Sequence, residues 1–288
     1  MKKRLVELLS GTLSPEELSR VYSSYDIVGD IAIIRLTSAS KKNAKRIADA
    51  VMSVHGSVKT VLAQTGAVGG DFRLRNLTYI AGENRTITVH KESGCLFSVD
   101  VNACYFSPRL SHERSRIASL VQPNETVVNM FAGVGCFSII IAKRVGSARV
   151  FSIDVNPAAV NFMRENLRLN RVYGRVLSLL GDAKAIVERE LQGRADRVLM
   201  PLPEKALFYL PSAVSALNPS GGWIHIYTFE HVTKTENHAE KMKQKVKEAL
   251  DGLSVDFEVP VVRVVRSTGP NWFQLVADVH LLPSPFMT

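Results

Sequence analysis

Cysteine is scarce in this sequence. The 288 residues include three cysteines, Cys95, Cys104 and Cys136, and no two of them form a CxxC pair. Scattered cysteines of odd number support neither a disulfide framework nor a zinc site, so we expect no metal. Free thiols are typical of a reducing compartment, and the predicted localisation is therefore the cytoplasm.

Long apolar runs are absent as well. No stretch approaches the roughly 18 apolar residues that a transmembrane helix needs, so we expect no membrane partner. The basic residues Lys2, Lys3 and Arg4 are followed by a polar stretch without a cleavage site, which argues against a signal peptide. The 46% hydrophobic and 22% charged residues are typical of a globular chain that buries a core.

The charges are unbalanced toward the positive. Lys and Arg number 36 against 27 Asp and Glu, which gives a formal net charge of +9. Basic side chains gain affinity for phosphates by displacing counterions, so a nucleic acid partner is one interpretation. A globular protein that is basic without such a partner is the other, and charge alone leaves both open.

Residues 1–100 predict a small α+β domain. Residues 1–28 have a helical and polar pattern, with Ser14 as an N-cap and Pro15 in the first turn. Apolar residues at helical spacing predict a second helix over 41–55. Alternating segments separated by turn residues predict strands over 30–36, 58–62, 77–81, 86–90 and 95–101.

Residues 101–288 alternate strands with helices, the pattern of a Rossmann-like α/β domain. An apolar strand from Thr126 runs into a turn with Gly133 and Gly135, and an apolar helix follows over 137–143. The next strand, 149–154, ends in Asp154, and a third, 175–180, leads into Asp182. Glycines and carboxylates at successive strand ends are typical of a nucleotide site.

These strand ends predict a nucleoside cofactor. The glycines let backbone amides approach a ligand, Asp154 can accept hydrogen bonds from both ribose hydroxyls, and Asp182 stands where an adenine amino group would bind. A dinucleotide is a weaker alternative, because Ser138 occupies the place of the third glycine in GxGxxG. An α/β sheet with tight turns and no ligand is the remaining alternative.

Several segments together resemble the tRNA guanine-37 N1-methyltransferase family of archaea and eukaryotes, whose close relatives make wyosine-type bases. The most particular is Tyr-Phe-Ser-Pro-Arg-Leu over 105–110, followed by Glu113 and Arg114, whereas the glycine loop is generic to class I methyltransferases. The others cover residues 26–33, 70–75, 81–85, 128–135, 154–157, 196–203 and 222–227. The resemblance implies a Rossmann-like class I methyltransferase domain, S-adenosylmethionine as cofactor and the anticodon stem-loop of tRNA as partner.

The resemblance also implies catalytic roles. Methylation of guanine N1 requires removal of its proton, and Glu113 corresponds to the family's general base. Arg73, from the preceding domain, corresponds to the residue that stabilises negative charge on O6. Without the resemblance, Glu113 is equally a helix-surface acid paired with Arg114 or Arg116, and Arg73 is an ordinary surface arginine or phosphate contact.

The cofactor residues carried over by the resemblance surround the strand ends. Tyr105 and Arg114 would close over the methionine end or the target base, and Asp154 and Val155 would lie at the ribose. The full cofactor set is Tyr105, Arg114, Asn129, Phe131, Gly133, Gly135, Asp154, Val155, Asp182, Ala183, Pro201 and Pro203.

Two positions depart from the family pattern. Asn129 stands where relatives usually carry Asp, so it brings no charge to the methionine ammonium group. Pro201-Leu202-Pro203 replaces Asn-Leu-Pro or Asn-Pro-Pro, and proline has no side-chain amide to contact the guanine edge. Base selection is therefore open, and a wyosine intermediate is an alternative substrate.

Three other functions remain as alternatives. A wyosine-pathway relative transfers the aminocarboxypropyl group of the same cofactor, and a non-catalytic RNA-binding protein would retain the fold. A DNA or protein methyltransferase leaves the N-terminal domain unexplained. We expect a monomer, and the short N-terminus suggests that the family's extra tRNA-elbow domain is reduced or missing.

Overall fold

The chain folds into two compact units, Met1–Arg109 and Leu110–Thr288. The computed structural model describes residues 2–22, 24–233 and 236–283. The predicted boundary at residue 100 falls nine residues before the division between these units, and the segment between the two positions is bonded to the N-terminal unit. Arg75 Nη2 donates to the Phe106 carbonyl at 3.1 Å, and Arg109 Nε donates to Asp26 at 2.6 Å.

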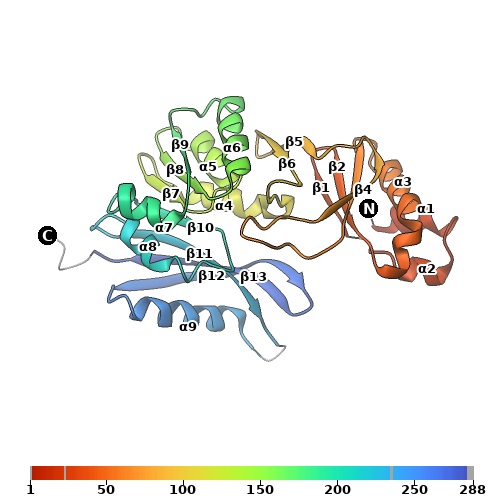
Figure 1. The fold of residues 1–288 in the computed structure, drawn as a ribbon. Coiled ribbons are helices and arrows are strands. Elements are labelled where there is room, and N and C mark those ends of the chain that lie inside the picture. Colours follow the sequence, from red (N-terminus) through yellow and green to blue (C-terminus); the bar gives the residue numbers. More distant parts are fainter. Residues whose placement is uncertain (1, 23, 234–235, 284–288) are drawn as a thin grey trace. The chain divides into compact units, whose positions relative to one another are not determined.

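The N-terminal unit is built on a four-stranded sheet of order β1-β2-β3-β4 (Figure 1). Strands β2 and β3 are parallel, the outer pairs are antiparallel, and β5 and β6 form a separate hairpin. The strands are β1 (Asp26–Val28), β2 (Ile31–Arg35), β3 (Thr60–Gln64), β4 (Leu77–Gly82), β5 (Ile87–Glu92) and β6 (Cys95–Asp100). The five strands predicted here are present, and β1 is an additional one.

Helices α1 (Lys2–Ser10) and α3 (Ala44–Val54) bury apolar stripes against this sheet, and α2 (Pro15–Ser19) lies between them in sequence. Leu5 and Leu9 of α1, four residues apart, share one core with Ile47 and Val51 of α3. A 3-10 turn, η1 (Ser38–Asn43), precedes α3, so the helix predicted over 41–55 begins as a tighter turn.

The predicted cap of α2 is confirmed, because the Ser14 hydroxyl accepts from the Glu17 amide at 3.2 Å in a capping box. The prediction of helix as far as residue 28 is wrong at its end. Residues 26–28 form β1, which pairs with β2 through a two-residue turn at Gly29 (φ +57°). Residues 1 and 23 of that predicted stretch lie outside the described residues.

The C-terminal unit holds a seven-stranded sheet of order β12-β13-β11-β10-β7-β8-β9. Five neighbouring strands, β11 to β9 in that order, are parallel, and β13 runs antiparallel to both β11 and β12. The strands are β7 (Thr126–Asn129), β8 (Arg149–Asp154), β9 (Val176–Leu180), β10 (Arg197–Met200), β11 (Gly222–His231), β12 (Phe257–Gly269) and β13 (Trp272–Leu281). The predicted parallel sheet is confirmed, with an antiparallel hairpin at one edge.

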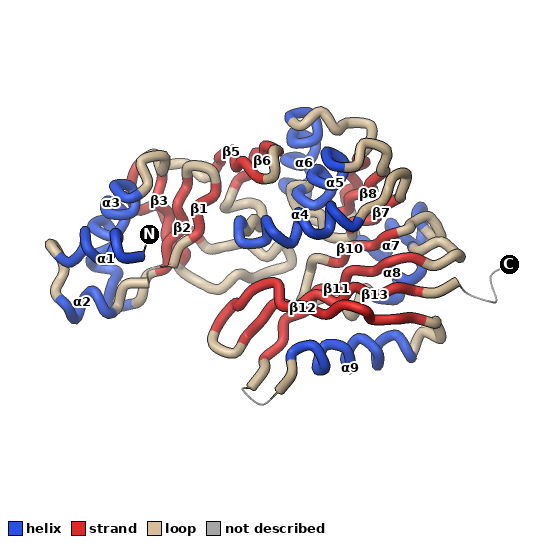
Figure 2. Tube along the Cα trace, turned by 180° about the vertical axis from the view of Figure 1, so that it is seen from behind, coloured by secondary structure: helices blue, strands red, loops and turns tan. Residues whose placement is uncertain are grey.

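Helices cover both faces of this sheet (Figures 1 and 2). One face carries α4 (Ser111–Leu120), α5 (Cys136–Arg144) and α6 (Pro157–Leu169), and the other carries α7 (Ala183–Ile186), α8 (Leu210–Ala216) and α9 (His238–Asp251). A 3-10 turn η2 (Pro108–Leu110) leads into α4, and a π-helical turn η3 (Val187–Leu191) follows α7. Within the described ranges, no helix is long and apolar enough to cross a membrane.

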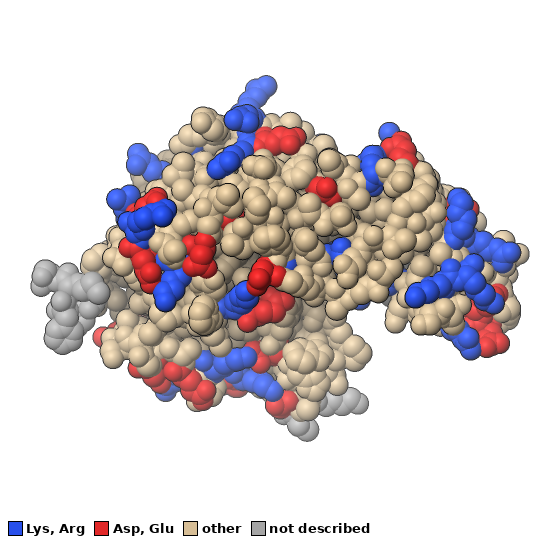
Figure 3. All heavy atoms as spheres, viewed as in Figure 1, with Lys and Arg blue, Asp and Glu red and all other residues tan. Residues whose placement is uncertain are grey.

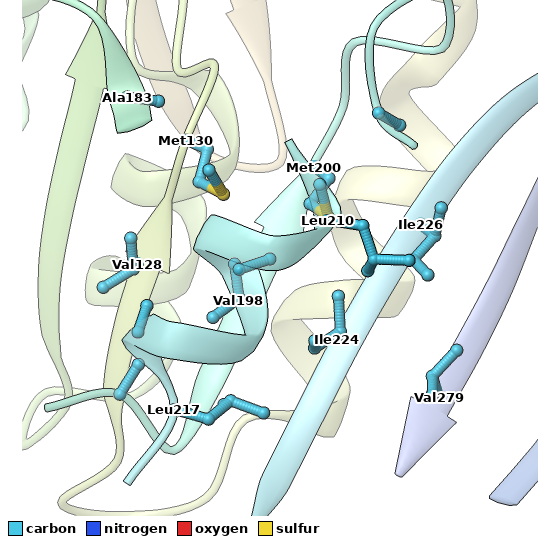
Figure 4. Close-up of a cluster of buried hydrophobic side chains, with 14 of the residues drawn as sticks. Val128, Met130, Ala183, Val198, Met200, Leu210, Leu217, Ile224, Ile226 and Val279 are labelled. Atoms are coloured by element: carbon cyan, nitrogen blue, oxygen red, sulfur yellow. The ribbon is translucent and has the colours of Figure 1, made fainter. Parts of the chain in front are cut away.

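The main core lies between the central strands and the face covered by α7, α8 and α9 (Figure 4). Val128, Val198 and Ile224 from three adjacent strands are fully buried there, and Leu210 of α8 packs onto them. Strands buried on both faces explain the nearly continuous apolar runs that the sequence shows in this half.

Arg197 on β10 joins its strand to three other elements of this unit. It is 3% exposed and donates from Nε and Nη2 to the Glu125 carboxylate at 2.8 and 3.0 Å. Its Nη2 also donates to the Leu120 carbonyl at 3.1 Å, and its Nη1 lies 2.7 Å from His225 Nε2. The end of α4, the start of β7 and the strands β10 and β11 are therefore tied by one buried guanidinium.

We expect Arg197→Met to lower the free energy of unfolding by about 3–5 kcal/mol, because the Glu125 carboxylate, which is only 14% exposed, then loses its charge partner. Urea denaturation followed by circular dichroism measures the change. Arg189→Met is the matched control, since Arg189 pairs with Glu190 on the exposed surface and its removal should change little. Equal effects of the two substitutions would contradict the role given to Arg197.

Candidate active site

The loop between β7 and α5 forms a cradle of backbone amides. Gly135 is the N-cap of α5 at φ +91°, and a Cβ there would lie 3.0 Å from the Met163 side chain and 3.1 Å from Ile139. The Gly133 amide donates to Asp154 Oδ2 at 2.6 Å. The loop therefore needs glycine at 135 for both conformation and space, and its amides are fixed against the end of β8.

Asp154 holds the centre of the cradle. Its Oδ1 accepts from the Asn156 amide at 2.9 Å, and its Oδ2 accepts from Gly133. Burial raises the pKa of this carboxyl, although the amides of Asn156 and Gly133 act in the opposite direction. The neighbouring Val155 is exposed, so a ligand can reach the end of this strand. A carboxylate has about four lone-pair sites, so Asp154 retains capacity for ribose hydroxyls.

Asn129 turns into the protein. It is fully buried, donates from Nδ2 to Ser138 Oγ at 3.1 Å, and accepts from the Phe131 amide at 3.4 Å. Ser152 on β8 donates to the same Ser138 hydroxyl at 2.7 Å. The Asn129 side chain is therefore held inside the protein by Ser138 and by the Phe131 amide. Contact of Asn129 with a cofactor stays a prediction.

Aromatic side chains border the other strand ends. The Phe131 and Tyr209 rings meet edge to face with centroids 5.1 Å apart, and the Tyr209 hydroxyl donates to Asp182. Asp182 also accepts from the Ala185 amide at 3.1 Å and so caps α7, while Ala183 is buried beneath. Sequence reasoning missed Tyr209, whose one signal was its place in an apolar segment shortly after the predicted proline motif.

The two predicted prolines follow β10. Pro201 is half-buried and Pro203 is buried, and the Leu202 amide between them donates to the Met200 carbonyl at 2.9 Å. The carboxyl ends of β7, β8, β9 and β10 share one edge of the sheet, since these strands are parallel. The predicted cofactor residues of this unit that follow these strands therefore converge on that edge.

Glu113 lies in the first turn of α4 and is buried, with 3% exposure, so it is not the helix-surface acid that the sequence alone left possible. Its Oε1 accepts from the Tyr227 hydroxyl and from Arg116 Nη2, both at 2.7 Å, and its Oε2 accepts from Arg116 Nε at 2.9 Å. Arg114, the next residue, is also buried.

A second set of buried polar side chains, Asp278 and His225, is bonded to Glu113 through Arg116. Arg116 donates to both oxygens of Asp278 on β13, at 2.6 and 3.0 Å, and Asp278 Oδ1 lies 2.6 Å from His225 Nδ1. Because the Arg197 guanidinium only donates, His225 Nε2 must accept from it, which assigns the imidazole proton to Nδ1 and toward Asp278. Sequence reasoning offered Arg116 as one partner of Glu113. It placed His225 and Tyr227 in a family-like segment without assigning them a role, and it did not single out Asp278.

Burial sets the protonation of this group of side chains. It lowers the pKa of His225, which therefore stays neutral, and it raises that of Tyr227, which stays a hydroxyl donor with the Glu113 charge beside it. For Asp278, burial acts to raise the pKa, but hydrogen bonds from His225 and Arg116 hold it well below its usual value. The group thus presents Glu113 with two fixed donors.

Arg73 and Tyr105 belong to the N-terminal unit, and the other predicted site residues belong to the C-terminal one. The Arg73 guanidinium stacks on the Tyr105 ring, 4.3 Å from its centroid. Arg73 has φ +55° in a tight turn closed by paired backbone bonds between Gly69 and Leu74. A left-handed conformation is uncommon for arginine, and such backbone is frequent at functional sites.

The sequence was compared with families of known proteins. Residues 88–257 match the TRM5/TYW2 methyltransferase domain, and residues 5–86 match the TYW2 N-terminal domain. The chain belongs to the TRM5/TYW2 methyltransferase family. The family predicted from the sequence is therefore confirmed, together with the Rossmann-like methyltransferase fold and its smaller N-terminal α+β domain.

Individual TRM5/TYW2 relatives cover most of the chain. The tRNA (guanine(37)-N(1))-methyltransferase Trm5b of Pyrococcus abyssi is 40% identical over 269 residues, 93% of this chain and 78% of the relative. The tRNA 4-demethylwyosine(37)-methyltransferase Taw21 of Saccharolobus solfataricus is 36% identical over 261 residues, 90% of this chain and 94% of the relative. The solved complex of aTrm5 with tRNALeu superposes with a TM-score of 0.82 at 34% identity, covering 97% of this chain and 78% of that one.

The buried His225 predicts how the stability of the fold depends on pH. The pKa of His225 is lowered in the folded state from its ordinary value of 6.5. Below pH 6.5 the unfolded chain therefore binds more protons than the folded one, and the free energy of unfolding falls as the pH drops. His225→Gln should flatten this decline in the free energy of unfolding between neutral and mildly acidic pH. Urea titrations at a series of pH values measure it, with the exposed His112→Gln as control. A wild-type slope in the His225 variant would refute the assignment.

Proposed function

We propose that this chain transfers a methyl group from S-adenosylmethionine to N1 of guanine-37 in tRNA, next to the anticodon. The observation that carries the proposal is the buried Glu113 carboxylate, held by Tyr227 and Arg116 in the same unit as a nucleotide cradle. The names of the Pyrococcus abyssi relative and of the tRNA complex support both the reaction and the partner.

The cradle residues fit an adenosine group. Asp154 and Val155 would meet the ribose, and Asp182 and Ala183 the adenine, with Phe131 against its ring. The loop around Gly133 and Gly135 would lie against the methionine end. When bound, S-adenosylmethionine supplies an electrophilic methyl group on a sulfonium. Pro201 and Pro203 border the same strand edge and would shape the pocket for the target base.

Glu113 is suited to take the N1 proton. Three of about four lone-pair sites of its carboxylate are occupied by Tyr227 and Arg116, which leaves one on Oε2. The N1–H of guanine would donate to that site, and the proton would pass to Glu113 as N1 gains the methyl group. The fixed donors hold the carboxylate in one orientation, so no reorganisation is needed at the moment of transfer.

The remaining predicted residues complete the proposal. Arg73, stacked on Tyr105, would stabilise the negative charge that develops on guanine O6. Arg114 follows the proposed general base, Glu113, in α4. It would contact the methionine end or the target nucleotide. We propose that the enzyme works as a monomer on the anticodon stem-loop.

A second candidate substrate is a wyosine precursor at the same position. Two observations favour it: Pro201 offers no side-chain amide to the guanine edge, and the Asn129 amide is committed to Ser138. The Saccharolobus solfataricus relative, which is named for 4-demethylwyosine, covers the chain to a similar extent as the Pyrococcus abyssi one.

Glu113→Gln should lower the single-turnover rate of methyl transfer by about 10²–10⁴-fold, because the base is removed. The rise of the rate with pH on the acidic side should also disappear. Binding of S-adenosylhomocysteine, measured by calorimetry, should stay close to wild type and shows that the variant is folded. Glu165→Gln, an exposed acid on α6, is the matched control. A wild-type pH–rate profile for Glu113→Gln would exclude Glu113 as the base.

The substrate assay uses two batches of S-adenosylmethionine, labelled in the methyl group or in the carboxyl carbon. We expect methyl label in an unmodified tRNA transcript and none when guanine-37 is replaced by adenine. Carboxyl label in tRNA would mean aminocarboxypropyl transfer instead. Methyl label only in tRNA carrying the tricyclic wyosine precursor would establish the second candidate, and no transfer to any of them would refute enzymatic function on tRNA.

A further inference from the structure

A row of arginines follows α6 into the loop before β9. Arg164 and Arg168 lie one helical turn apart on α6, and Arg171 and Arg175 follow in the loop after it. Glu165 is the single acidic residue in the sequence between Asp154 and Asp182. Figure 3 shows Lys and Arg side chains projecting over the region of α6. This segment is therefore strongly basic within a unit that elsewhere mixes both charges.

Three of these arginines, Arg164, Arg168 and Arg175, border a groove of about 610 Å³ between α6 and the first halves of β8 and β9. Arg149, Arg164, Arg168 and Arg175 line it, and none of the described residues that line it carries a carboxylate. β9 is the edge strand of the sheet, so the groove opens along an uncovered side. Its volume lies in the range of ligand sites and accommodates a nucleotide.

The arginines of the groove fall into two kinds. Arg175 is braced, since it donates to the carbonyls of Ala142 at 2.9 Å and Arg171 at 3.1 Å. Arg149 and Arg168 are exposed and have no ion pair or side-chain hydrogen bond to any residue that the structure describes. Two positive charges of the groove are thus available to an external anion.

Apolar side chains at the groove add a second feature. Tyr173 is 75% exposed and Leu177 is 53% exposed, and both line the groove. An exposed aromatic ring beside uncompensated arginines is the combination that binds single-stranded nucleic acid, where bases stack on the ring and phosphates meet the charges. An acidic protein surface would pair with the arginines, but it would not offer a base to stack on Tyr173.

We propose that this groove binds an RNA strand, with phosphates at Arg149 and Arg168 and a base stacked on Tyr173. The groove lies at the beginning of β8 and β9, whereas the cofactor cradle lies at their ends, so it is a second contact surface on the same unit. The identification of this strand as part of the tRNA substrate rests on the proposed function. Binding of RNA by the groove does not depend on the proposed function.

The test measures tRNA affinity by fluorescence anisotropy over a series of salt concentrations. The double variant Arg149→Ala/Arg168→Ala should reduce the slope of log Kd against log salt by about two, because each arginine neutralises one phosphate. Tyr173→Ala should weaken binding by about fivefold or more at every salt concentration without changing the slope, because stacking carries no charge. Binding of S-adenosylhomocysteine should be unchanged in all variants.

The matched control is Lys243→Ala/Lys247→Ala, which removes two exposed positive charges from α9. Equal slopes for the control and the groove variant would overturn the proposal, because the effect would then reflect net charge alone. Wild-type binding by the groove variants, or no tRNA binding by the wild-type protein, would also overturn it. If tRNA binds with the expected slopes but no label is transferred, the groove stands and the proposed function fails.

Discussion

The C-terminal unit depends on pairing the charges that it buries. A continuous series of bonds joins Glu125, Arg197, His225, Asp278, Arg116, Glu113 and Tyr227. Each ion removed from water costs several kcal/mol, which is offset only where its neighbours supply opposite charge or hydrogen bonds. Because the members come from α4, β10, β11, β13 and the residue before β7, the bonds that satisfy these charges also fix the helix that carries Glu113 to the sheet.

The nucleotide side of the proposed site is built differently. It uses backbone amides at Gly133 and Asn156, neutral side chains at Asn129 and Ser138, and the half-buried carboxylate of Asp154. Such a cradle is specified by short-range geometry, where glycine permits the loop and Asp154 locks it. The charged network is specified by partners far apart in sequence. The two parts of the proposed site therefore place different demands on the sequence.

That difference decides what could be predicted from the sequence. The strands, the glycine turn and Asp154 follow local patterns, so they were predictable from periodicity and turn residues. The strand β1, Tyr209 and the Tyr227 hydroxyl on Glu113 were not. In the sequence, Asp26–Val28 resembles the end of a helix, and its pairing with β2 makes it a strand. No residue near Asp278 in the sequence indicates that Asp278 contacts Arg116. The family resemblance supplied Glu113, and the sequence left its surroundings ambiguous between surface and interior.

The bond between Arg116 and Asp278 spans 162 positions of the chain. During synthesis, the strands and loops of the cradle emerge from the ribosome well before β13, which carries Asp278. A nascent chain can therefore assemble the parallel part of its sheet while Arg116 and His225 still lack their shared carboxylate. Orientation of Glu113 is completed only when β13 is made, so an incomplete polypeptide would have the proposed nucleotide cradle before the Glu113 carboxylate is ordered.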